Sequence, residues 1–394
     1  RFLALSFALI CGTLSSFAAA PAGGPAVGTS VGNYTDLGIV QYVVKSWNDG
    51  IELADGSKGA YEVEIAGLNF EGKSIAPADL KELTIKLSFQ EMYGSVKPTY
   101  VVTSIKATDV SKKEAFYGNT NLTKLEFVNT DAIKNPVNFT IGAYSFYACT
   151  NLKDLIFPDN VSAIGEYAFQ NTAVVDFEIP ANCATIAPFA FYNCKKLNTV
   201  TVRTKTDKDG KDIGGDLNAL QGKVFANSTL ETLDLSKAYG LKTVGSATES
   251  PFLYNLSDIN DQLTTVILPA LKDDKATQSE VTNVYSSFKN CTALETITNL
   301  DITKITTFPS DAFNNCQSLK KLEFPIGELG TSMLIGTTTA VPFQGCVSLE
   351  TLTFAEDFWG KIGGNDKNLF GLDVDADADN QSRSALQCYG LEKR

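Results

Sequence analysis

The chain has 394 residues, 44% of them hydrophobic, and a formal net charge of -12 at pH 7. This hydrophobic content predicts a folded chain. Its length favours repeats, because a single compact core usually stops growing at about 250 to 300 residues. The acidic charge argues against a nucleic-acid partner, since binding a phosphate backbone requires clustered Lys and Arg. Histidine is absent, which excludes Ser-His and Cys-His catalysis as well as His-containing zinc sites.

The first segment, residues 1–20, is predicted to be a secretory signal peptide. An apolar stretch from Phe2 to Phe17 leads into Ala18-Ala19-Ala20, which fits a small-residue cleavage site. A buried helix or a membrane span is the alternative, but the stretch is shorter than the roughly 20 residues that span a bilayer. We therefore expect a secreted or cell-surface protein in which residues 21–33 form a flexible linker. No other apolar run is long enough to cross a membrane.

Residues 34–100 come next and are predicted to form an N-terminal cap or divergent first coils. Within them, Leu83-Thr84-Ile85-Lys86-Leu87 alternates apolar and polar residues as a half-buried strand does. Solenoids need terminal units of this kind, because an end coil has a neighbour on one side only.

The remainder of the chain, residues 101–394, repeats one frame. Phe146 to Pro158 and Phe313 to Pro325 share the pattern F-x-x-C-x-x-L-x-x-L-x-F-P, and weaker copies begin at Phe116, Phe169, Phe225 and Phe252. The shortest steps between copies are 22, 23 and 25 residues. These values lie within the range of about 20 to 29 residues for leucine-rich repeats. Longer steps contain polar inserts at 204–215 and 272–279, which we expect on loops.

Each frame predicts one coil of a solenoid. In L-x-x-L-x-F-P the alternation indicates a short strand, with Leu155 and Phe157 pointing inward and Asp154 and Ile156 pointing outward. The segment containing the leading Phe is the return turn, with the ring filling the interior. One coil cannot bury its own apolar face, so neighbouring coils share a continuous core.

A small residue that can hydrogen-bond follows each leading Phe by three positions. We expect these residues to form a ladder that satisfies buried turn backbone, because an unpaired buried peptide group is costly. The predicted ladder consists of Asn119, Cys149, Thr172, Cys194, Ser228, Asn255, Cys291, Cys316 and Cys346. Reduced structural thiols are favoured here, although disulfides between cysteines of neighbouring coils stay open.

The frame, together with the intervening phrase V-x-x-I-x-x-x-A-F at Val161 to Phe169, resembles the BspA-type leucine-rich repeats of bacterial surface proteins. The resemblance extends from about Tyr100 to Arg394, and Tyr100 to Ile105 is similar to the phrase that opens such arrays. It implies an α/β-type repeat solenoid, mostly β, with short strands, turns and few short helices. We expect the array to be truncated at its C-terminus. The resemblance also implies an exposed, adhesin-like protein that binds host proteins or other cells.

Stacked side by side, the outward strand positions form an extended face, which is how solenoids usually bind partners. Polar strand residues can also simply face water, so binding is one of two interpretations of this face. The candidate binding residues are Lys153, Asp154, Thr199, Thr201, Glu231, Asp234, Glu295, Lys320, Lys321, Glu323 and Glu350.

The leading functional hypothesis is a secreted or cell-surface protein that mediates protein binding or adhesion. Its expected partners are host or neighbouring-cell proteins, including extracellular matrix. No catalytic residue, metal or cofactor is predicted. Alternating carboxylates at Asp373 to Asp379 suit calcium, but their spacing departs from an EF-hand loop and a solvated acidic loop is favoured.

The alternative is a carbohydrate-binding or glycan-processing surface protein. Hydrolysis would require two carboxyl groups about 5 to 10 Å apart, one of them in an apolar setting. Glycan binding would need exposed aromatic rings, and Trp47 and Trp359 are the only tryptophans.

Overall fold

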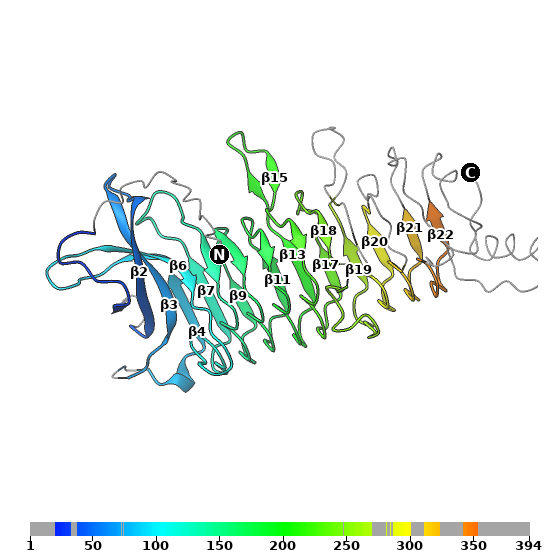
Figure 1. Cartoon of the computed structure of the whole chain (residues 1–394), viewed down its shortest axis with the longest axis horizontal. Helices are drawn as coiled ribbons and strands as arrows, with labels where there is room; N and C mark the ends of the chain where they lie inside the picture. Colours follow the sequence, from blue (N-terminus) through cyan, green and yellow to red (C-terminus); the bar gives the residue numbers. More distant parts are fainter. Residues whose placement is uncertain are drawn as a thin grey trace, which may run out of the picture.

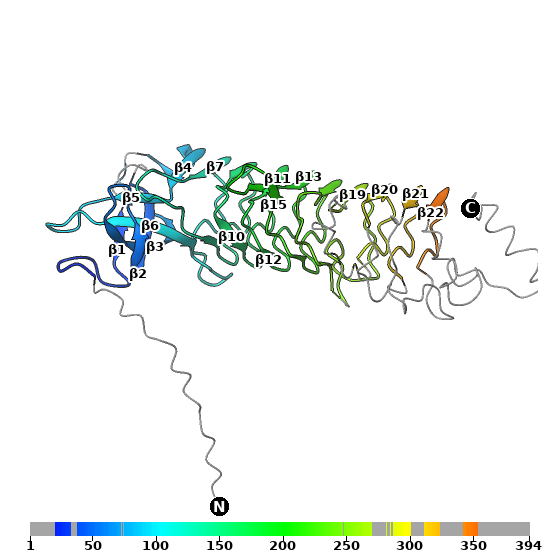
Figure 2. The same ribbon diagram turned by 90° about the horizontal axis from the view of Figure 1, so that it is seen from above.

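The chain winds into an elongated stack of coils, and successive coils add strands to two walls that run along the long axis (Figures 1 and 2). This computed structural model describes residues 20–32, 38–71, 73, 75–246, 248–269, 281, 284, 287–300, 311–323 and 342–353. The described part is nearly all strand and turn, with helix confined there to the short 3-10 helix η2 (Pro77–Asp79). The predicted mostly-β repeat solenoid is therefore confirmed. The predicted signal peptide up to residue 19, and Asp373 to Asp379, lie outside the described residues.

The first wall is one sheet whose strands pair in parallel from β3 onward. In order it contains β3 (Lys58–Leu68), β6 (Thr99–Ile105), β8 (Phe139–Ile141), β10 (Val161–Ile164), β12 (Thr185–Ile186), β16 (Ala219–Leu220) and β18 (Thr243–Val244).

The second wall consists of two parallel sheets placed one after the other. The first holds β4 (Glu82–Lys86), β7 (Lys124–Val128) and β9 (Asp154–Ile156). The second holds β11 (Asp176–Ile179), β13 (Thr199–Val202), β17 (Thr232–Asp234), β19 (Thr265–Ile267), β20 (Thr296–Thr298), β21 (Lys321–Glu323) and β22 (Thr351–Thr353).

The N-terminal end of the stack is made of antiparallel strands. β1 (Ser30–Gly32) pairs with β2 (Val40–Glu52), β2 pairs with β3, and β5 (Ser88–Gln90) pairs with β6. Because β3 continues into the first wall and β4 opens the second, these two strands form the first coil. β1 lies within the stretch 21–33, which was expected to form a flexible linker.

The insert at 204–215 forms a hairpin of β14 (Lys205–Thr206) and β15 (Asp212–Gly214) that projects from the stack (Figure 1). Its tip is an Asp-Gly turn, in which the Asp207 carboxylate accepts hydrogen bonds from the amides of Asp209 and Lys211. Gly210 adopts a φ of +77°, a conformation that favours glycine. The insert at 272–279 lies outside the described residues.

A column of phenylalanine rings runs through the interior between the walls. Consecutive rings are stacked with centroid separations between 4.9 and 6.4 Å, and every ring is buried. We call this column the phenylalanine spine: Phe116, Phe146, Phe169, Phe191, Phe225, Phe252, Phe288, Phe313 and Phe343. It contains the leading Phe of every coil in the described residues from the second onward, so the hydrophobic interior there is continuous from coil to coil.

The position three residues after most spine rings holds a buried polar group. The thiols of Cys149, Cys194, Cys316 and Cys346 each donate to the carbonyl oxygen of the preceding coil's spine residue, at 3.0 to 3.1 Å. Asn119 acts within its own turn instead. Its side-chain oxygen accepts hydrogen bonds from the amides of Asn121 and Leu122. Thr172 and Ser228 are also buried, and Thr172 lies 3.4 Å from the Cys194 sulfur.

Asn255 does not belong to this ladder, which corrects the prediction. Its side chain is exposed and pairs with Asp258, whereas Asn260 is buried beside Cys291 of the next coil. The Asn260 oxygen accepts from the amides of Gln262 and Leu263, the same arrangement as at Asn119. Additional residues after Phe252 displace the slot along the chain.

All six cysteines in the described residues are buried and carry free thiols. Burial raises the pKa of Cys149 and Cys346 to about 12 and that of Cys194 to about 11. Since the thiolate is the reactive form, these groups are inert structural donors in the folded chain.

Substitution at Cys194 tests this structural role. Cys194→Ala leaves the Phe169 carbonyl without its 3.1 Å donor, so we expect the free energy of unfolding to fall by about 1 to 3 kcal/mol. Cys194→Ser retains a donor and should cost less. Urea titration followed by circular dichroism measures both, and equal losses for Ser and Ala would contradict the hydrogen-bonding role.

Two turn positions beside the spine adopt the left-handed conformation. Two residues after the ring, φ is positive at Asn171, Asn193 and Asn227. The side-chain amide of Asn193 donates to the side-chain oxygen of Asn171, and that of Asn227 donates to Asn193. Asparagine tolerates this conformation better than most residues, so the sequence suits the backbone there. Two residues before the ring, φ is positive at Tyr144, Tyr167 and Phe189, where bulky rings are unusual.

Candidate binding surface on the second wall

The outer face of the second wall carries polar side chains in rows. Parallel pairing places Thr199, Thr232, Thr265 and Thr296 in one register, so their side chains form a row across four strands. Buried Val200, Leu233, Val266 and Ile297 lie between the outward residues and face the spine. The alternation predicted from the sequence therefore directs the polar positions outward.

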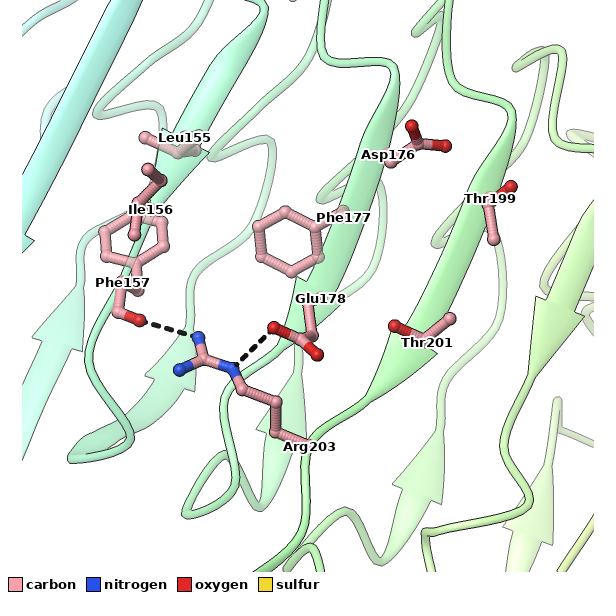
Figure 3. A pocket seen from close by; sticks show the side chains of 9 residues that line it. All are labelled: Leu155, Ile156, Phe157, Asp176, Phe177, Glu178, Thr199, Thr201 and Arg203. Atoms are coloured by element: carbon pink, nitrogen blue, oxygen red, sulfur yellow. Dashed lines mark hydrogen bonds and ion pairs between the residues drawn. The ribbon is translucent and has the colours of Figure 1, made fainter.

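This wall is interrupted between β9 and β11, which belong to different sheets (Figure 3). Elsewhere an amide at the start of each strand donates to the preceding coil, as Lys153 does to Thr123 and Asn198 does to Val175. Among the described residues, no such bond joins Val175 to Lys153.

Coil length alone does not account for the interruption. Buried Val174 follows the ladder residue Thr172 by two positions, one fewer than separate Cys149 and Leu152, but Ser228 and Leu230 are also two apart and β17 still pairs with β13. Val175 occupies the outward position that Lys153 holds in the preceding coil, and it is 41% exposed. The coil from Phe169 to Phe191 is the 22-residue unit, the shortest step between described spine rings.

Two adjoining hollows occupy the interruption, of about 270 and 290 Å³. Their floor is apolar and includes Leu155, Phe157 and Phe177 (Figure 3). Ile156 stands at the edge of both hollows with 44% of its surface exposed. Charged side chains surround this apolar centre: Lys124, Lys153, Asp154, Asp176, Glu178 and Arg203.

Arg203 bridges the two sheets at one end of the hollow. Its guanidinium donates to the Phe157 carbonyl oxygen at 2.6 Å and lies 2.8 Å from the Asp159 carboxylate. It also forms an ion pair with Glu178 at 3.1 Å (Figure 3). Because Phe157 and Asp159 follow β9 and Glu178 lies on β11, Arg203 holds the sides of the hollow in place.

The predicted binding residues fall into two groups. Lys153, Asp154, Thr199 and Thr201 all line the hollows. The others lie further along the same wall or at its strand entrances: Glu231, Asp234, Glu295, Lys320, Lys321, Glu323 and Glu350.

Some members of the second group already have partners. Lys320 pairs with Glu295 at 2.7 Å, and the Asp234 carboxylate accepts from the Ser236 amide. Residues such as these stabilise the wall itself, so they are weaker candidates for contacting a partner.

Val175, Asp176, Glu178 and Arg203 were not predicted as site residues. They come together at the interruption of the wall. The ladder-to-leucine spacing gave no signal for it, because the two-residue step after Thr172 recurs after Ser228, where the wall is continuous.

The carboxylates at the hollow are exposed: Asp176 and Glu178 project from β11, and Asp154 lies on β9. Glu178 is 59% exposed and paired with Arg203. A proton donor in glycoside hydrolysis needs an apolar setting instead. Within the described residues, no cluster of three or more Cys, Asp or Glu side chains is arranged to hold a metal ion.

Residues 108–247 and 275–364, more than half of the chain, match the model of the BspA type leucine rich repeat region in six copies. The chain belongs to this family. The BspA-type repeats cover the coils on both sides of the hollow, which therefore lies within the repeat array. No functionally curated protein matches the chain.

Several solved structures are similar to this BspA-type chain. A leucine-rich repeat protein from Bacteroides ovatus is 17% identical, with 80% of this chain and 87% of that one covered and a TM-score of 0.26. A leucine rich cell surface protein from Faecalibacterium prausnitzii is 16% identical, with 85% and 97% covered and a TM-score of 0.26. The pneumococcal vaccine antigen PcpA is 12% identical, with 86% and 98% covered and a TM-score of 0.24.

No helix in the described residues has the length and hydrophobicity that a membrane crossing would require.

Proposed function

We propose that this chain is a secreted or cell-surface interaction protein that binds a protein partner at the hollow between β9 and β11. The observation that carries the proposal is the exposed apolar pair, Ile156 and Val175, within a ring of charged side chains. Protein interfaces often combine a central apolar anchor with a polar rim.

The size and shape of the hollow favour a protein over a small molecule. Ligand pockets commonly have volumes of about 300 to 1,000 Å³ and enclose most of their ligand. Each hollow here is smaller than that and lies open on the face of a wall. Such a site suits one or two side chains of a partner whose remaining contacts spread over the flat wall.

Family membership supports the exposed location. BspA-type repeats define the chain, and one similar solved protein, from Faecalibacterium prausnitzii, is described as a cell surface protein. A solenoid wall also offers a long contact surface, which suits adhesion to host or neighbouring-cell proteins.

Adhesion of cells that display the chain tests the proposal. We expect displaying cells to bind at least one immobilised extracellular-matrix protein. The double variant Ile156→Asp with Val175→Asp should lose at least about tenfold in affinity, because it puts charge in the apolar anchor. Ile267→Asp, on the same wall but three strands further along, is the matched control and should bind normally.

Unchanged adhesion by the double variant would refute the hollow as the binding site. Equal losses in the double variant and in Ile267→Asp would also count against it, since they would indicate a diffuse effect on the wall.

A further inference from the structure

A second cluster of aromatic side chains lies outside the core, at the turns that lead from the first wall to the second. We call it the aromatic ribbon: Tyr117, Tyr144, Tyr147, Tyr167, Phe189, Tyr192 and Tyr254. The rings of Tyr144, Tyr167 and Phe189 stack in successive coils with centroids 4.7 Å apart at each step. The remaining rings extend the cluster through contacts of 4.8 to 6.1 Å.

Backbone conformation does not account for these aromatic residues. Tyr144, Tyr167 and Phe189 adopt φ values of +57°, +55° and +61°, which disfavour bulky side chains. At the other left-handed turn position the same coils use Ala148, Asn171 and Asn193. The backbone conformation at the aromatic positions therefore costs free energy, which favourable contacts of the rings must offset.

Ring stacking supplies part of this stabilisation, because an aromatic pair contributes about 0.5 to 1.5 kcal/mol beyond burial. Stacking does not require the hydroxyl groups, however, and Phe189 shows that a plain ring fits. Within the described residues, the hydroxyls of Tyr144, Tyr147 and Tyr167 form no hydrogen bond. The rings of these three tyrosines are half-buried. The ribbon thus presents ring edges and a row of hydroxyl donors to solvent.

The hydroxyls remain donors over the physiological range. Partial burial, with a smaller effect of neighbouring acidic groups, raises the pKa of Tyr144 and Tyr167 above its ordinary value near 10. Charge at the far end of the ribbon is positive but already paired, since Lys223 lies 5.5 Å from the Phe189 ring centre and 2.8 Å from Glu249.

We propose that the aromatic ribbon binds an extended proline-rich segment of a partner protein in the polyproline II conformation. This conformation has no internal hydrogen bonds, so its carbonyl oxygens are free to accept, and proline has no amide to donate. A row of donors beside apolar ring edges complements such a chain. Aromatic surfaces are the usual docking sites of proline-rich segments.

The spacing of the ribbon agrees with this ligand. Polyproline II repeats every three residues, over about 9.3 Å. Two steps along the ribbon at 4.7 Å each cover nearly the same distance. A bound β-strand presents equivalent side chains about every 6.6 Å, so its side chains would not align with successive rings of the ribbon. Sugar rings would need an open aromatic face to stack on, and the neighbouring ring covers the faces within this stack.

Titration calorimetry with a proline-rich peptide of about twelve residues tests the proposal, with a Gly/Ser peptide of equal length as the ligand control. We expect the proline-rich peptide alone to bind. The double variant Tyr144→Phe with Tyr167→Phe keeps the stacked rings and removes two donors, so its affinity should fall about tenfold. Tyr93→Phe, a half-buried tyrosine outside the ribbon, should bind as the wild type does.

Three results would overturn the inference: no binding of the proline-rich peptide, equal affinity for the double Phe variant, or binding of a soluble glucan oligosaccharide in its place. The double variant should unfold at the same urea concentration as the wild type, which separates ligand binding from turn stability. The aromatic ribbon and the hollow share no residue, so Ile156→Asp should leave peptide binding unchanged.

Discussion

Phe191→Ala should lower the free energy of unfolding by about 3 to 5 kcal/mol, the largest effect expected from any single substitution in the described coils. The ring is fully buried, and its centroid lies 5.0 Å from that of Phe169 and 5.6 Å from that of Phe225. It also contacts Phe177, whose centroid is 4.7 Å away. Removing it opens a cavity in the spine and breaks the continuity between two coils, which depend on each other for burial.

Urea unfolding followed by circular dichroism gives the size of the loss. Ile213→Ala serves as the control, because this residue of the hairpin is 45% exposed and its truncation should change stability by no more than about 0.5 kcal/mol. A loss below about 1 kcal/mol at Phe191 would mean that the coils do not rely on the spine.

The second large effect is expected at Arg203, which spans the interruption between β9 and β11. Arg203→Ala removes the donor to the Phe157 carbonyl oxygen and the ion pairs with Asp159 and Glu178. We expect the two sides of the hollow to loosen, so hydrogen exchange at the backbone amides of β11 should become at least about tenfold faster. Unchanged exchange at these amides would show that Arg203 does not hold the two sheets together.

The solenoid and its spine could be predicted from the sequence because the determinants are local and repeated. A Phe recurs every 22 to 36 residues, and the alternating strand that follows it has a single way to bury its apolar side. Leu322 and Leu349 occupy the buried positions that the frame assigns to them. The polar slot after each ring could be predicted for the same reason.

Prediction failed where the spacing changes. The ladder position after Phe252 falls on Asn260, eight residues later rather than three, so counting from the ring selected the exposed Asn255 instead. The hollow was missed because spacing does not reveal it: the same short step follows Thr172 and Ser228, and the wall is interrupted only beside the first. Whether adjacent strands pair becomes visible only when they are compared in the structure.

The aromatic ribbon was missed for a different reason. Tyr144, Tyr167 and Phe189 stand two places before a spine ring in three successive coils, so their recurrence was visible. The candidate binding residues were outward strand positions, whereas these three residues lie in turns. The left-handed turn that brings these side chains together is a backbone property, which residue identity alone does not indicate.

The most direct test of binding at the hollow compares the affinities of the wild-type chain and of the double variant Ile156→Asp with Val175→Asp for the same matrix protein. Biolayer interferometry with the purified chains is suitable, with the fold of the variant checked by its unfolding midpoint. We expect the double variant to bind at least about tenfold more weakly while it remains folded, because charge replaces the exposed apolar pair at the centre of the hollow. Equal affinity of the two folded chains would contradict the proposal that the hollow is the binding site.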